Sequence, residues 1–141
     1  MNRLILIPQK HYLECGVACI SMITGRPYDE VIKKYGKDRT SNYQIKNAIS
    51  SYMKKRNLRF ISFKDWDYLK NREENIIAIV AMNFRRKLKK WHWVVFKKLK
   101  GKSRVLDPSP MDKGRIRTDF NKMKRLRSCL IIKCLTLIST I

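Results

Sequence analysis

Glycine and proline are scarce in this sequence, which contains five of the first and four of the second among 141 residues. Collagen-like chains and low-complexity disordered chains need far more of both. Apolar residues make up 44% of the chain, which is enough to build a hydrophobic core, and the length matches the usual size of one domain. We therefore expect a single folded domain that spans residues 1–141.

Long hydrophobic runs are also missing. The apolar run near the start, residues 4–7, is too short for the core of a secretory signal and is not followed by a small-residue cleavage site. The apolar tail, residues 129–141, includes Lys133 and falls short of the roughly 20 residues that cross a bilayer. We expect no export signal and no transmembrane segment, and a cytoplasmic location.

The chain has only four cysteines, Cys15, Cys19, Cys129 and Cys134. A domain of this size does not need disulfides for stability, and without an export signal we expect reduced thiols. The spacings C-x3-C and C-x4-C differ from those of zinc knuckles, and the first pair falls within one expected helix. The sequence therefore predicts no metal site and no cofactor.

Acidic residues are outnumbered by basic ones, 11 to 33, which gives a net charge of +22. Residues 1–84 hold 15 basic and 8 acidic groups, and residues 85–141 hold 18 and 3. Such a field attracts nucleic acid, an anionic membrane or an acidic protein such as an inhibitor or immunity protein. A solvated lysine-rich surface explains the same composition, so the charge leaves the partner open.

Helical spacing of apolar residues characterises three segments in the first part of the chain: residues 15–25, 27–36 and 40–56. Glycines close the first two segments, and Thr40 or Ser41 is placed to cap the third. The pattern then changes to short runs typical of strands, at residues 58–63, 75–81, 91–98, 103–106 and 128–133. A short helix is expected at residues 119–124. Helices followed by strands predict an α+β domain in which an antiparallel sheet packs on one helical side.

Cys15 stands where the first helix is expected to begin. A helix N-terminus supplies partial positive charge and free N–H groups that stabilise a thiolate, which is the nucleophilic form of cysteine. Cys19 lies one turn further along, where burial among apolar neighbours favours a neutral thiol. We predict that Cys15 is a nucleophile and that Cys19 is a packing residue.

His92 is the better of two candidates for a base, since the chain contains only His11 and His92. It belongs to the expected strand WHWVVF, where alternation places it on the same face as Val94 and Phe96. An isolated strand histidine is usually structural. The following strand, VLDP, adds a partner for it, because Asp107 comes fifteen residues later, beyond a turn near Gly101.

A hairpin between these two strands would bring Asp107 to His92. We expect the carboxylate to accept the imidazole Nδ1–H, which leaves the other ring nitrogen facing the thiol. Attack on a carbonyl also needs donors for the developing oxyanion. The side-chain amide of Gln9, six residues before Cys15, is a candidate for one of them.

The segments IPQKHYLECGVACISMITG, WHWVVF and VLDP resemble, in order and spacing, the bacteriocin-processing cysteine peptidases that cut double-glycine leaders. The resemblance implies a papain-like fold, with Gln9 in the oxyanion hole, Cys15 as nucleophile, His92 as general base and Asp107 as its orienting carboxylate. Two positions depart from the usual family pattern. Glu14 stands where aspartate is usual, and Trp91 stands where glycine is usual before the histidine.

Four functions remain open at this point. The first is a monomeric peptidase that acts on a peptide or protein. The second is a toxin-like nuclease, in which the basic runs and the tryptophans Trp91 and Trp93 hold RNA. The third is a protein deamidase or acyl transferase that uses the same residues, and the fourth is a noncatalytic binding module.

Overall fold

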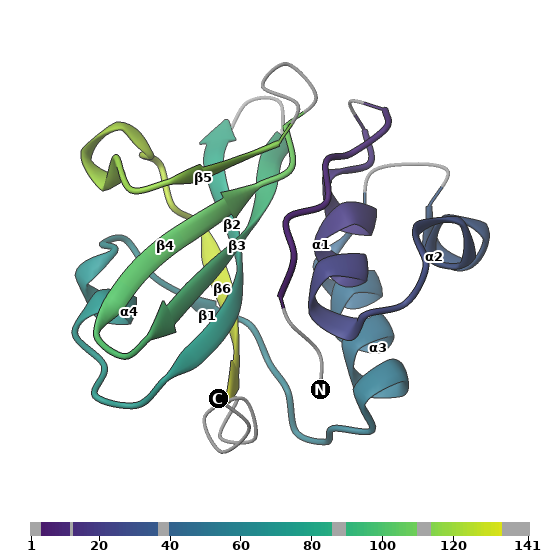
Figure 1. The fold of residues 1–141 in the computed structure, drawn as a ribbon, viewed down its shortest axis with the longest axis horizontal. Helices are drawn as coiled ribbons and strands as arrows, with labels where there is room; N and C mark the ends of the chain where they lie inside the picture. The colour runs from purple at the N-terminus through teal and green to yellow at the C-terminus, as the bar shows by residue number, and fades with distance from the viewer. Residues whose placement is uncertain (1–3, 12, 37–39, 86–89, 110–113, 134–141) are drawn as a thin grey trace.

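Three helices come first in the chain and a six-stranded sheet contains the strands that follow (Figure 1). The computed structural model describes residues 4–11, 13–36, 40–85, 90–109 and 114–133. The helices are α1 (Cys15–Thr24), α2 (Tyr28–Tyr35), α3 (Asn42–Met53) and α4 (Asp67–Lys70). The strands are β1 (Ile61–Ser62), β2 (Ile76–Arg85), β3 (Lys90–Leu99), β4 (Lys102–Asp107), β5 (Arg115–Arg117) and β6 (Ser128–Lys133). The α+β order expected from the sequence is confirmed.

Local signals explain where the helices begin and end. Gly25 ends α1 in the left-handed conformation, with φ of 74°, and its N–H bonds the carbonyl of Ser21. Ser41 caps α3 in a reciprocal capping box with Gln44. Of the two expected caps, Ser41 is therefore the one used. The helix is shorter than expected, because Lys54 adopts a left-handed conformation directly after Met53.

The described strands form one antiparallel sheet in the order β1-β6-β2-β3-β4-β5. The last strand, β6, inserts between β1 and β2, so the end of the described chain lies next to its middle. The hairpin β3–β4 has a regular register that pairs Val95 with Leu106 and Phe96 with Val105. This register brings the start of β3 and the end of β4 to the same end of the sheet.

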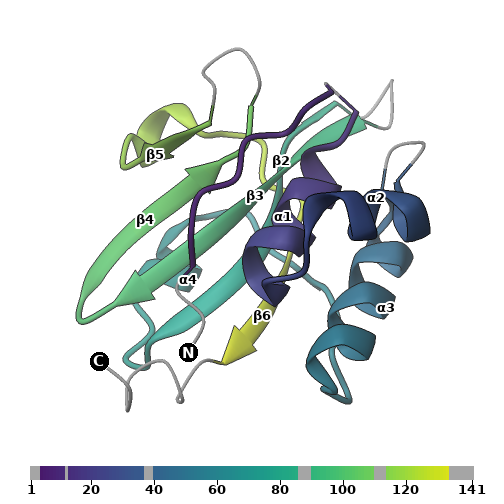
Figure 2. The ribbon, with the colours of Figure 1, turned by 45° about the vertical axis from the view of Figure 1, so that its right-hand side comes forward.

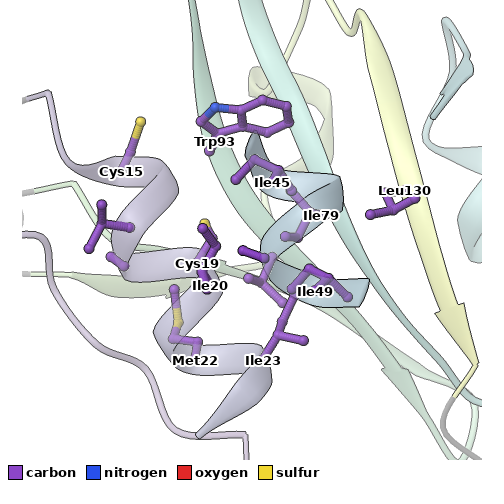
Figure 3. Packing of buried hydrophobic residues seen from close by; sticks show 14 of the residues in the cluster. Cys15, Cys19, Ile20, Met22, Ile23, Ile45, Ile49, Ile79, Trp93 and Leu130 are labelled. Atoms are coloured by element: carbon purple, nitrogen blue, oxygen red, sulfur yellow. The ribbon is translucent and has the colours of Figure 1, made fainter. Parts of the chain in front are cut away.

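Both faces of the sheet are buried. On one face, α1 and α3 pack their apolar side chains against β2, β3 and β6 (Figure 3). On the other face, Trp66, Leu69, Phe96 and Met123 belong to a second cluster around α4 and the 3-10 helix Phe120–Lys122. Figures 1 and 2 show α1, α2 and α3 together on one side of the strands, and Figure 1 shows the four-residue helix α4 on the other side. The expected packing of the N-terminal helices on one face of the antiparallel sheet is confirmed. The other face is covered as well, because its row of strand side chains is also apolar.

Four segments differ from the sequence-based prediction. Neither α4 nor β5 was expected, and the segment expected as a helix at residues 119–124 forms only the short 3-10 turn. The run at residues 58–63 pairs over just two residues. The part of the apolar tail beyond Lys133 lies outside the residues that the structure describes. Within the described ranges, no helix is both long enough and apolar enough to cross a bilayer.

Candidate active site

Cys15 is the first residue of α1, and its side chain lies at the mouth of the helix (Figure 3). The preceding residue, Glu14, makes no side-chain cap to the first turn. Its carboxylate accepts the hydroxyl of Tyr28 at 2.6 Å instead. The N–H groups of the first turn therefore keep their capacity to stabilise an anion at Cys15.

Gly16 lets α1 approach the rest of the domain closely. A Cβ at this position would lie 2.5 Å from both Cβ and Oγ1 of Thr40 and 3.1 Å from Cδ1 of Trp93. Thr40 is itself fixed, because its carbonyl accepts the indole N–H of Trp93 at 2.8 Å. Any side chain on Gly16 would push the start of α1, and Cys15 with it, away from β3.

His92 and Asp107 form a hydrogen bond at the end of the sheet where β3 begins and β4 ends. Nε2 of His92 lies 2.7 Å from Oδ1 of Asp107. The expected partner was Nδ1, and the register explains the difference. Continued from Val95↔Leu106, the pairing places Asp107 diagonally from His92, so the distal nitrogen of the ring reaches the carboxylate. Nδ1 is thereby left for the thiol.

The electrostatics of His92 reflect both neighbours. Burial by itself lowers the pKa of His92, but hydrogen bonds with Asp107 and Cys15 and the negative charges of both outweigh that effect. The pKa of His92 is raised to about 9. Burial also opposes ionisation of Asp107, yet the His92 hydrogen bond and charge, together with donors from Ser109 and Arg117, hold its pKa below the usual value. An imidazolium and a carboxylate thus face each other at neutral pH.

This pair should make the stability of the protein depend on pH. Below the ordinary histidine pKa of 6.5, His92 is protonated in both the folded and unfolded states, and its stabilising contribution is fully present. As the pH rises from 6.5 towards about 9, His92 stays protonated in the folded state and loses its proton in the unfolded state, so the unfolded state becomes relatively more favourable. We expect the free energy of unfolding, measured by urea denaturation, to fall across this range. An equal fall in the His92→Ala variant would contradict the assignment.

Gln9 lies in the segment that leads into α1 and is buried, with 4% of its surface exposed. Its backbone N–H bonds the carbonyl of Pro108 at 2.8 Å, which ties this segment to the residue after Asp107. Its side-chain nitrogen donates to the carbonyl of His11 at 2.9 Å. If the side-chain oxygen and nitrogen of Gln9 were exchanged, the side-chain carbonyl would face the carbonyl of His11, so the present orientation is favoured. The second hydrogen of the Gln9 amide nitrogen takes no part in the bond to His11.

The comparisons with known proteins concern the fold. No family model and no curated sequence matches the chain. A solved structure of a double glycine motif protease from an AMS/PCAT transporter, in complex with the leader peptide, matches with a TM-score of 0.64 and 20% identity over 94% of this chain and 93% of that one. The chain has the fold of the double-glycine peptidase domains.

Two further structures of this fold agree. The peptidase domain of Streptococcus ComA, a bi-functional ABC transporter involved in a quorum sensing pathway, matches with a TM-score of 0.60 and 15% identity over 93% of this chain and 99% of that one. The peptidase domain of Streptococcus mutans ComA in complex with a small molecule inhibitor matches with a TM-score of 0.52 and 18% identity. The match covers 91% of this chain and 98% of that one. The papain-like fold implied by the sequence resemblance is therefore confirmed.

The other described cysteines are unsuited to attack. Cys19 and Cys129 are fully buried, and burial raises the pKa of both thiols, to about 12 for Cys129. All three described cysteines are free, and Cys134 lies outside the described residues. The residues described here contain no group of three side chains suited to hold a metal ion.

One group of basic side chains lies away from this site. A hollow of about 180 Å³ at the hairpin end of β3 and β4 is lined by Lys97, Leu99, Lys100, Lys102 and Arg104. His92 and Asp107 lie at the opposite end of the same two strands. Trp93, one of the two tryptophans suggested for stacking bases, is 2% exposed and donates its indole N–H to Thr40. It belongs to the core of the peptidase fold, which removes one argument for RNA binding.

Sequence reasoning missed Arg117. Its Nη1 donates to Oδ2 of Asp107 at 3.2 Å. The segment around it, residues 114–127, holds several arginines and lysines with no pattern that selects one of them. Only the position of β5 at the edge of the sheet, paired with β4, identifies the arginine that reaches the carboxylate.

Proposed function

We propose that this chain is a cysteine peptidase in which Cys15 is the nucleophile, His92 the general acid and base, and Asp107 the group that orients His92. One observation carries the proposal: Nε2 of His92 lies 2.7 Å from Oδ1 of Asp107, and Cys15 at the mouth of α1 is near enough to His92 to contribute to its raised pKa. When a thiol, an imidazole and a carboxylate lie next to one another in this spatial order, they can generate a thiolate and use it as a nucleophile. The fold, shared with solved peptidase domains, supports the same chemistry.

The reaction follows from the arrangement of these groups. The Cys15 thiolate forms a bond to the carbonyl carbon of the substrate, and the C=O electron pair moves to oxygen. When the tetrahedral intermediate collapses, the C–N bond breaks and the imidazolium of His92 gives its proton to the departing amine. Water then loses a proton to neutral His92 and attacks the thioester carbonyl. The C–S bond breaks, which releases the acid and restores the Cys15 thiolate beside the His92 imidazolium. Throughout, the Nε2–H bond to Asp107 keeps Nδ1 directed towards sulfur.

Gln9 is proposed as an oxyanion donor. Its amide nitrogen has one hydrogen on the carbonyl of His11, and the second hydrogen is free of that bond. The backbone N–H of Cys15 at the start of α1 is the natural second donor. The backbone N–H of Gln9 is bonded to the carbonyl of Pro108, the residue after Asp107. This bond fixes the backbone from which the Gln9 amide extends relative to Asp107.

For the substrate, we propose a peptide with a pair of glycines before the cleaved bond. The support is the similarity in fold to a double glycine motif protease that was solved with its leader peptide. Glycines allow a chain to approach a crowded nucleophile closely, since they carry no Cβ. Trp91, which contacts Trp93 edge-on with ring centres 5.8 Å apart, supplies bulk beside His92 that would disfavour larger residues.

Mass spectrometry of synthetic peptides tests the proposal. We would incubate the protein with a peptide that carries a central Gly-Gly pair and with a matched peptide carrying Leu-Leu. The expected result is a new C-terminus after the second glycine, made by the wild-type protein and not by Cys15→Ala, and little cutting of the Leu-Leu peptide. A glutamine-rich peptide added to the same reaction would reveal a deamidase, and a deamidation product without cleavage would contradict the peptidase assignment.

A further inference from the structure

We propose that Arg117, anchored by Asp119, is a positioning residue that holds the carboxylate of Asp107 in line with His92. The inference rests on the proposed function and deepens it, since it assigns a role to a residue from the edge strand β5. Arg117 touches neither Cys15 nor His92 in the contacts described for it, so its effect must pass through Asp107.

The guanidinium group makes three directed bonds. Nε and Nη2 of Arg117 donate to the two carboxylate oxygens of Asp119 at 3.0 and 2.8 Å, which is a bidentate pairing. Nη1 is thereby aimed at Oδ2 of Asp107, 3.2 Å away. A lysine in this position would offer a point charge but no planar group that both carboxylates can fix.

Each oxygen of Asp107 has its own donors. Oδ1 lies 2.7 Å from Nε2 of His92 and also accepts the N–H of Ser109 at 3.0 Å. Oδ2 is bonded by Arg117. The bond from Arg117 therefore restricts rotation of the carboxylate, and this restriction keeps Oδ1 facing the imidazole.

Burial makes this restriction effective. The side chains of Asp107 and Arg117 are 3% and 12% exposed, so water competes little for their bonds. Asp119 is more exposed, but the hydrogen bonds from Arg117 lower its pKa to about 2, so it remains an anion at any pH at which the enzyme would work. The result is a row of alternating charges that runs from Asp119 through Arg117 and Asp107 to His92.

Other charged groups near this row are few among the described residues. Arg115 lies directly across from Asp107 in the β4–β5 pairing, and its charge also lowers the pKa of Asp119. Arg115 is exposed and belongs to the same strand as Arg117. It therefore provides a matched control, because its substitution removes the same charge from β5 and leaves the bond between Arg117 and Asp107 in place.

The pKa of His92 distinguishes positioning from simple charge. Loss of a nearby positive charge by itself would raise the pKa of His92. Loss of the aligned hydrogen bond that His92 donates to Asp107 would lower the pKa of His92. A fall in the pKa of His92 after removal of Arg117 therefore shows that the carboxylate has become misaligned.

Nuclear magnetic resonance of ¹⁵N-labelled imidazoles can measure this, since the chain holds only two histidines. We expect the pKa of His92 to fall below the wild-type value in Arg117→Gln, to fall less in Arg117→Lys, and to stay or rise slightly in Arg115→Gln. At neutral pH, the rate of alkylation of Cys15 by iodoacetamide should fall about tenfold in Arg117→Gln, the usual effect of losing a bond to a charged group. Peptide mapping would separate Cys15 from the other cysteines.

Two outcomes would overturn the inference in different ways. If wild-type His92 titrates well above 6.5 and Cys15 reacts in a His92-dependent manner, but Arg117→Gln and Arg117→Lys match the wild type, the positioning role is wrong and the proposed function stands. If wild-type His92 titrates near 6.5 and Cys15 reacts as slowly as in His92→Ala, both proposals fail together. If Arg117→Gln does not fold, Arg117→Lys decides the question alone.

Discussion

Replacing Cys15 with alanine is expected to reduce cleavage of a Gly-Gly peptide by about 10⁴-fold or more, because among the described residues at the mouth of α1 Cys15 alone is placed to form the acyl-enzyme. The residue is 8% exposed and contacts the first core cluster, so its loss should also lower the free energy of unfolding, by roughly 1 kcal/mol for a small side chain at a site that can partly relax. Turnover by peptide mass spectrometry and stability by urea denaturation would measure the two effects separately.

Cys19→Ala is the matched control, since Cys19 lies one turn along the same helix and is fully buried. It should lose a comparable amount of stability while keeping the wild-type rate of cleavage. If both variants lost activity in proportion to their stability, the Cys15 effect would reflect folding, and the nucleophile would have to be sought elsewhere.

Replacing His92 with alanine is expected to have the second-largest effect, a fall of about 10³-fold in kcat/KM, within the range known for loss of a general acid and base. The fold should survive, because Asp107 keeps its bonds from Ser109 and Arg117 and is not left as an unpaired buried charge. Iodoacetamide should also alkylate Cys15 more slowly at neutral pH, since the imidazolium that stabilises the thiolate is gone.

Two control measurements accompany the His92→Ala variant. His11→Ala removes the only other histidine, which is exposed and lies before α1, and it should leave turnover near the wild-type rate. Added imidazole should restore part of the activity of His92→Ala if the vacated space admits it. Equal activities of the His11 and His92 variants would remove His92 from the mechanism.

Much of the fold could be predicted because its signals are local. Gly25 and Ser41 mark helix ends through their own conformational and hydrogen-bonding preferences, and the apolar runs of β2, β3 and β6 are long enough to be recognised as strands. The four-residue helix α4 and the three-residue strand β5 carry too few residues for any periodicity. They form because tertiary contacts supply what their sequences lack. The expectations of one domain, a monomer and a cytoplasmic location stay predictions.

For the candidate site, the expected helix start and strand ends indicated Cys15, His92 and Asp107, and the resemblance to the bacteriocin-processing peptidases implied these three together with Gln9. It could not say which ring nitrogen meets the carboxylate. That depends on the diagonal placement of Asp107 across the hairpin, which places Nε2 within 2.7 Å of it. The roles of the four residues remain proposals that the variants above test.

By itself, the amino-acid sequence determined the order of the first three helices and the longer strands, the thiol at the start of α1 and the histidine and aspartate on neighbouring strands, since each depends on interactions between residues close in the chain. Only the tertiary structure decided that both faces of the sheet are covered, that Trp93 is buried against Thr40, and that Arg117 bonds Asp107. These features join residues that are distant in the sequence. Their free energy comes from burial and directed bonds that exist only after the strands have found their register.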